Sequence, residues 1–160
     1  MPITLAHREL PFVDITFDEL DERLTALMNQ YGPTLLRYAI GVVFVWFGAL
    51  KALGVSPAGD LVAATVYFVP AELFVPILGI WEVAIGLCLL YRRLVRIGIL
   101  LLAVQMPGTF LPLLLLPDVV FTAFPYGLTI EGQYIVKNLV LISAALVVGG
   151  TVRSQQRGRR

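Results

Sequence analysis

The chain has 160 residues, of which 58% are hydrophobic and 14% are charged. A soluble domain has about 45–50% apolar and about 25% charged residues, so this balance indicates a membrane protein and excludes an ordinary soluble fold. A net charge of +1 gives no reason to expect a nucleic-acid partner.

The residue types used in redox and metal sites are scarce. Cys88 is the one cysteine and cannot form an internal disulfide, which argues against an oxidoreductase of the Cys-x-x-Cys type. His7 is the one histidine and lies outside every apolar stretch, so a haem held by two histidines of this chain is excluded. We predict no metal site, and the polar residues 1–30 do not predict a secretory signal peptide.

Residues 1–34 form a polar segment in which a helix is predicted over about 16–31. Thr16 and Glu19 have the capping-box spacing, and Gly32-Pro33 predicts the helix end. The residues of the apolar face are Phe17, Leu20, Leu24, Leu27 and Met28, and those of the charged face are Asp18, Asp21, Glu22 and Arg23. This amphipathic helix could lie on the membrane surface, on a partner or on the protein's own bundle, and its acidic face argues against binding to anionic lipid.

Four apolar stretches follow, each near or above the roughly 20 residues that a helix needs to cross a bilayer. They are residues 35–53, 70–91, 94–116 and 134–152. The sequence therefore predicts an all-α membrane protein, a four-transmembrane-helix bundle over 35–152 with a cytoplasmic N-terminal amphipathic helix. A basic cytoplasmic tail, 153–160, completes the predicted organisation.

The arginines predict the orientation. They gather between the second and third spans and after the fourth, whereas residues 54–69 and 117–133 contain no Arg or Lys. The positive-inside rule then places both termini in the cytoplasm and these two loops outside. Both loops are rich in apolar and aromatic residues, which fits either an aromatic belt at the headgroups or a lid over the bundle.

Helical spacing places the small and polar residues of each span on one stripe. The stripes are Arg37, Gly41, Phe44, Gly48 and Lys51; Glu72, Val75, Gly79, Glu82 and Gly86; Gly98, Leu101, Gln105, Gly108 and Pro112; and Tyr134, Lys137, Leu141, Ala144 and Val148, with Asn138 beside Lys137. Small residues allow close helix approach and polar residues avoid lipid, so we expect the four stripes to converge.

Glu82 is the most unusual of these residues. A rise of about 1.5 Å per residue places it about 15–18 Å from the outer end of its span, with Gln105 at nearly the same depth. Lys51, Lys137 and Asn138 are expected near the outer boundary, and Arg37 near the inner one. The sequence thus predicts an outer polar layer above a midplane pair.

Three interpretations of Glu82 stay open. It could be protonated and hydrogen-bonded to Gln105 as a structural contact, or it could take up and release a proton in a redox or transport step. It could also form an ion pair with Lys51 or Lys137, although both lysines could equally extend to the outer headgroups. Pro107 and Pro112 predict a kink beside Gln105, which could open a cleft for a quinone or be a plain bend.

Three short motifs resemble the DoxX/DoxD family of four-span inner-membrane proteins of bacteria and archaea. They are Arg37 to Lys51, Gly79-x-x-Glu82-x-x-x-Gly86, and Gly132 to Asn138. Arg37, Lys51, Glu82, Lys137 and Asn138 match recurrent polar positions of that family. The resemblance implies a bacterial or archaeal cytoplasmic membrane and, for some members, a thiosulfate:quinone oxidoreductase.

The resulting functional hypothesis is a DoxX-like membrane subunit of a respiratory or redox complex. Lys51, Lys137, Asn138 and Arg37 would bind a quinone oxygen or a small anion, and Glu82 with Gln105 would handle the proton. Quinone is the expected cofactor, and other membrane proteins or further copies of the chain are the expected partners. The alternatives are a non-catalytic accessory subunit of a larger membrane assembly and, less favoured, a small transporter.

Overall fold

The computed structural model describes residues 17–67 and 69–157 and divides the chain into two compact units, Met1–Gly32 and Pro33–Arg160. Helix α1 (Phe17–Ala52) runs through the boundary between the units. The predicted helix end at Gly32-Pro33 is therefore wrong. Proline removes one backbone N–H, and the helix continues because the flanking residues keep their own bonds. The predicted Thr16 cap and the last three residues of the basic tail lie outside the described residues.

The second unit confirms four helices that are long and apolar enough to cross a membrane. They are the part of α1 from Pro33 onward, α3 (Ala71–Leu90), α4 (Val95–Phe110) continued by α5 (Pro112–Leu115), and α7 (Ile130–Arg157). The third span is interrupted at Leu111, because Pro112 has no N–H for the Gly108 carbonyl, which accepts from the Leu111 N–H at 3.2 Å instead.

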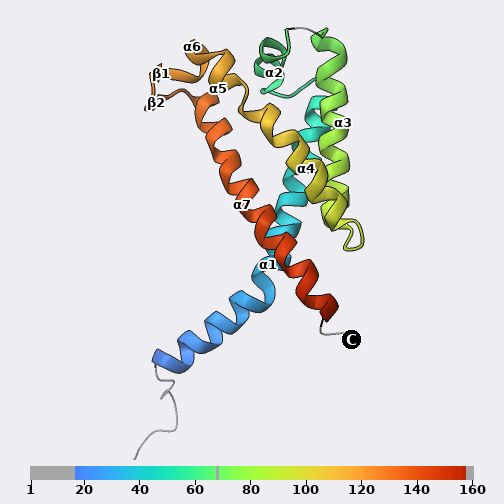
Figure 1. The fold of residues 1–160 in the computed structure, drawn as a ribbon, viewed down its shortest axis with the longest axis vertical. Helices are drawn as coiled ribbons and strands as arrows, with labels where there is room; N and C mark the ends of the chain where they lie inside the picture. Colours follow the sequence, from blue (N-terminus) through green and yellow to red (C-terminus); the bar gives the residue numbers. More distant parts are fainter. Residues whose placement is uncertain (1–16, 68, 158–160) are drawn as a thin grey trace, which may run out of the picture. The chain divides into compact units, whose positions relative to one another are not determined.

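The two apolar loops are folded rather than extended. The first contains α2 (Gly59–Thr65), which packs against α3, and the second contains α6 (Pro117–Val120), which packs against α7. A short antiparallel hairpin of β1 (Phe121–Ala123) and β2 (Gly127–Leu128) follows α6. Figure 1 shows α2 and the hairpin at the same end of the second unit, which we call the α2 end.

Two local motifs set where the helices of the α2 end begin and stop. Gly54 has φ of 71°, and the Val55 and Gly54 N–H groups bond to the Leu50 and Lys51 carbonyls, the two bonds of a Schellman motif. This motif ends α1 at Ala52, one residue after Lys51. At the start of α7 the Thr129 hydroxyl accepts from the Gly132 N–H at 3.1 Å and acts as its N-cap.

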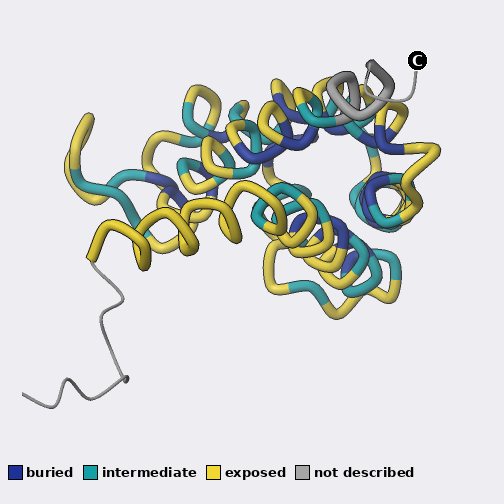
Figure 2. The backbone as a smooth tube through the Cα atoms, turned by 90° about the horizontal axis from the view of Figure 1, so that it is seen from below, coloured by how far each residue is buried: buried dark blue, intermediate teal, exposed yellow. Residues whose placement is uncertain are grey.

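The core of the second unit draws on all four spans. Its buried residues are Ile40, Phe44, Ile85, Leu89, Val95, Leu102, Met106, Ala144, Ala145 and Val148. Figure 2 shows buried segments on the faces that the helices turn toward one another, with exposed residues outside. The outer faces are apolar as well, which is compatible with contact to a lipid bilayer.

The stripe predictions hold for α1 and fail in part for α7. In α1 the buried set is Ile40, Gly41, Phe44, Gly48 and Lys51, four of which were on the predicted stripe. In α7, Ala144 and Val148 are buried, but Tyr134 and Lys137 are exposed and Ile135 is buried in their place. The predicted inward face of α7 is therefore wrong near the α2 end, because Ile135 rather than Lys137 faces the neighbouring segments.

Candidate functional site

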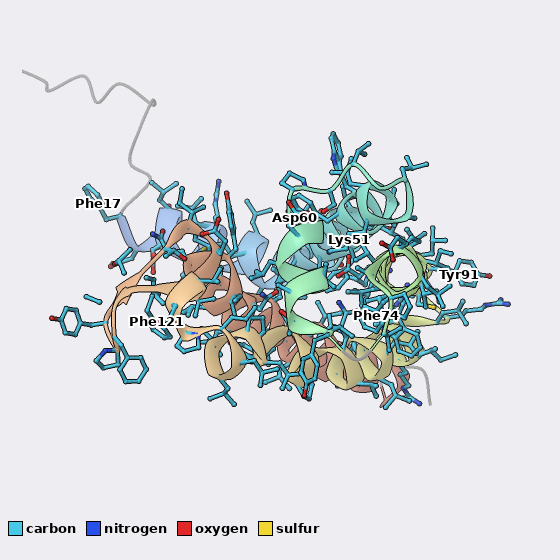
Figure 3. The ribbon with its side chains drawn as sticks, turned by 90° about the horizontal axis from the view of Figure 1, so that it is seen from above. Phe17, Lys51, Asp60, Phe74, Tyr91 and Phe121 are labelled. Atoms are coloured by element: carbon cyan, nitrogen blue, oxygen red, sulfur yellow. The ribbon has the colours of Figure 1, made fainter. Side chains whose placement is uncertain are left out.

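Three polar side chains from three different spans meet inside the bundle. Lys51 Nζ of α1 donates to Glu82 Oε2 of α3 at 2.6 Å, and Gln105 Nε2 of α4 donates to Glu82 Oε1 at 2.8 Å. Lys51 is 9% exposed and Glu82 is 7% exposed. We call these three residues the polar cluster. Figure 3 views the second unit from the α2 end and labels Lys51.

Two glycines bring the helices close enough for the cluster to form. Gly48 lies one helical turn before Lys51, and Gly79 lies one turn before Glu82. A Cβ added to Gly48 would be 2.7 Å from the Gly79 carbonyl oxygen and 2.8 Å from Glu82 Cβ. A Cβ on Gly79 would be 2.9 Å from Lys51 Cβ, so any side chain at either position would push the two helices apart.

The ends of α1 and α3 are not level, which explains why the predicted depths differ from the observed contact. Gly79 lies against Lys51 and Ala52, the last two residues of α1. It is eight residues into α3, so α3 extends about 12 Å beyond the end of α1. Counting depth from each helix end therefore placed Lys51 and Glu82 in different layers, although they are neighbours.

The structure pairs Glu82 with Lys51, which is one of the three interpretations, and the same carboxylate also contacts Gln105. Each carboxylate oxygen accepts one bond, and the opposite charges offset the cost of burying either alone. The pairing with Lys137 is not found: of the two lysines, Lys51 is the one bonded to Glu82.

The cluster leaves one acceptor open. Because the Gln105 amide nitrogen faces the carboxylate, the amide oxygen Oε1 points elsewhere, and it is buried with no hydrogen-bond partner among the described residues. A buried amide oxygen without a donor costs about 1–3 kcal/mol. A group that donates a hydrogen bond at this position would remove that cost.

Arg37 makes hydrogen bonds to α3 that the sequence did not predict. Its Nη1 donates to the carbonyls of Leu89 and Leu90 at 2.9 and 3.0 Å, at the C-terminal end of α3. These carbonyls have no partner within the helix, and a cation there also suits the helix dipole. In the sequence, this contact was indicated only by the antiparallel order of α1 and α3, which places Arg37 near the C-terminal end of α3 and Lys51 at the other end of α1.

Lys137 and Asn138, the other predicted ligand-binding residues, are bound within their own helix. Asn138 Nδ2 donates to the Tyr134 and Ile135 carbonyls, both at 3.1 Å, and Lys137 Nζ lies 5.0 Å from the centre of the Tyr134 ring. The structure thus brings together Lys51, Glu82 and Gln105 and does not add Lys137, Asn138 or Arg37 to them.

Over residues 17–67 and 69–157, the carboxylate, cysteine and histidine side chains form no group of three that could hold a metal ion. The donor groups available to a ligand at the polar cluster are an ammonium and an amide, and the open acceptor is an amide oxygen. Comparison with protein-family models, with curated proteins and with solved structures finds no match to this chain.

Proposed function

We propose that the protein is a DoxX-like integral membrane subunit of a quinone-linked redox complex and that the polar cluster is one wall of its quinone site. The observation that carries the proposal is the buried Gln105 Oε1 with no donor, next to the paired Lys51 and Glu82. A quinol hydroxyl is a donor of the required kind, and a quinol partitions into lipid rather than into water.

The cluster would divide the work between its members. Gln105 would accept the hydrogen bond from one quinol hydroxyl, and Lys51 would keep Glu82 in place. Oxidation of the quinol to the quinone releases two protons and two electrons. Glu82 would receive the proton of that hydroxyl, the proton of the second hydroxyl would pass to water, and both electrons would pass to a redox partner in the complex. This version of the site rests on Lys51, Glu82 and Gln105, since Arg37, Lys137 and Asn138 are engaged elsewhere.

The test is quinone binding by the purified chain in lipid nanodiscs, measured with a short-tailed quinol. Gln105→Leu removes the open acceptor, and we expect the dissociation constant to rise about tenfold, the effect of one lost hydrogen bond. Gln133→Leu, an amide removed from the exposed face of α7, is the matched control and should leave affinity unchanged. Equal affinity in wild type and Gln105→Leu, or no binding by wild type, contradicts the proposal.

A second candidate is a non-catalytic accessory subunit of a larger membrane assembly. It is favoured by the pairing of Lys51 with Glu82, which by itself is a structural contact between α1 and α3. In this case the chain purifies with a larger partner, binds no quinone, and loses thermal stability rather than affinity when Gln105 is replaced.

A further inference from the structure

The β1–β2 hairpin of the second unit carries aromatic surface that the polar cluster does not use. We call its turn, Phe124, Pro125 and Tyr126, the hairpin tip; Phe124 is 72% exposed and Tyr126 is 83% exposed. The Phe121 ring of β1 packs edge-on against the Phe124 ring, with 5.1 Å between the ring centres. The tip therefore turns ordered aromatic side chains toward its surroundings.

Hydrogen bonds hold the base of the hairpin beside the first turn of α7. The Thr129 N–H donates to the Val120 carbonyl at 3.0 Å, and the Thr129 hydroxyl donates to the Val119 carbonyl at 2.9 Å. Gly132, the third residue of α7, is buried against the same Val120 carbonyl and leaves no room for a Cβ. Because β1 begins at the next residue, the hairpin leaves the bundle at the level of the first turn of α7.

The two outer loops differ in direction. Helix α2 packs against α3 and α5, and its Leu61 and Val62 are half-buried. Figures 1 and 3 show α2 beside α3, whereas the hairpin projects sideways on the side of the second unit away from α3. A lid has to lie over the bundle, so of the two loops α2 fits that role and the hairpin does not.

The exposed apolar surface of the hairpin continues onto the helices next to it. Leu114 and Leu115 of α5 are exposed, as are Ile130 and Tyr134 at the start of α7. These side chains lie at the ends of two helices that are long and apolar enough to cross a bilayer, where the surrounding medium is lipid. A hairpin that projects sideways from this level meets the same lipid, at the boundary where aromatic rings are enriched.

We propose that the hairpin tip lies in the headgroup region of the bilayer beside α7 and anchors the start of that helix at the membrane surface. The Tyr126 ring contacts acyl carbons and its hydroxyl contacts headgroups or water. Residues 117–133 contain two carboxylates and no Lys or Arg, so the contact depends on the rings and not on attraction to anionic lipid. A protein is the poorer occupant, because a stable interface buries about 800 Å² on each side, more than a three-residue tip offers. The proposal is independent of quinone binding.

The test is the accessibility of nitroxide spin labels on the full chain in phosphatidylcholine vesicles, with the native thiol removed by Cys88→Ala. Phe124→Cys carries the label at the hairpin tip. Val104→Cys, an exposed position in the middle of the third span, is the reference for the bilayer interior, and Asp60→Cys, exposed on α2, is the reference for water. At each site, collisions with oxygen, which concentrates in lipid, are divided by collisions with a water-soluble nickel complex.

We expect the oxygen-to-nickel ratio at Phe124→Cys to be severalfold above that at Asp60→Cys and below that at Val104→Cys. Tyr126→Cys labels the other side of the tip and should give the same order, so the result does not depend on the folding of one variant. A ratio at the tip no higher than at Asp60→Cys would place it in water. Few collisions with either reagent would mean that protein covers the tip, and either result overturns the proposal.

Discussion

Polar side chains in the apolar helices find their partners in two different ways. Those of α1 and α3 contact other helices, whereas those of α7 contact their own helix. Lys51 and Glu82 are buried and bond to each other across two helices, with Gln105 joining from a third. Lys137 is exposed and lies over a ring one turn away, and Asn138 bonds to carbonyls of its own helix. A polar group in an apolar helix can thus be satisfied by a neighbouring helix or by its own, and the choice determines whether it stabilises the bundle.

The largest effect should come from one substitution made in both regions. Lys51→Met leaves the Glu82 carboxylate buried without its cation, and we expect a loss of about 3–5 kcal/mol in the free energy of unfolding. Lys137→Met removes an exposed lysine from α7 and should change it by less than about 0.5 kcal/mol. Unfolding of both variants in mixed detergent micelles measures the difference, and similar losses would show that the two lysines are equivalent.

Replacing both members of the ion pair sharpens this result. The variant with Lys51→Met and Glu82→Met has no buried charge to leave unpaired, so it should recover most of the stability lost in Lys51→Met. The free energy of unfolding of the double variant is measured in the same mixed detergent micelles, and its thermal unfolding midpoint in detergent provides an independent check. A double variant no more stable than Lys51→Met would mean that loss of the acceptor of the Gln105 amide costs as much as leaving the Glu82 carboxylate unpaired.

A smaller effect with opposite signs is expected from two glycines. Gly79→Ala places a Cβ against Gly48 and Lys51, and should destabilise the protein by about 1–3 kcal/mol as α1 and α3 move apart. Gly150→Ala in α7 has no heavy atom within 4 Å to obstruct it and should stabilise the helix by about 0.5–1 kcal/mol. Thermal unfolding distinguishes them, and a neutral Gly79→Ala would argue against the close approach of the two helices.

The faces of α1 could be predicted because helical period and residue size point in the same direction there. Gly41, Phe44, Gly48 and Lys51 repeat every three or four residues, and all four are buried. In α7 the same reasoning misplaced Tyr134 and Lys137, because the stripe was drawn through these polar residues rather than through Gly132, which is buried beside the Val120 carbonyl one turn before Ile135. The continuation of α1 through Pro33 was missed for a different reason: a proline marks a probable helix boundary, and here the surrounding bonds carry the helix past it.

What the sequence alone determined is the number of spans and the set of polar residues from which the polar cluster is drawn. Length and hydropathy depend only on the order of residues, and a carboxylate, an ammonium or an amide is conspicuous among apolar side chains. Only the tertiary structure decided which of the polar residues meet. Their contact depends on the axial offset between α1 and α3. The close approach of Gly48 and Gly79 sets this offset, which cannot be read from the sequence of either helix alone.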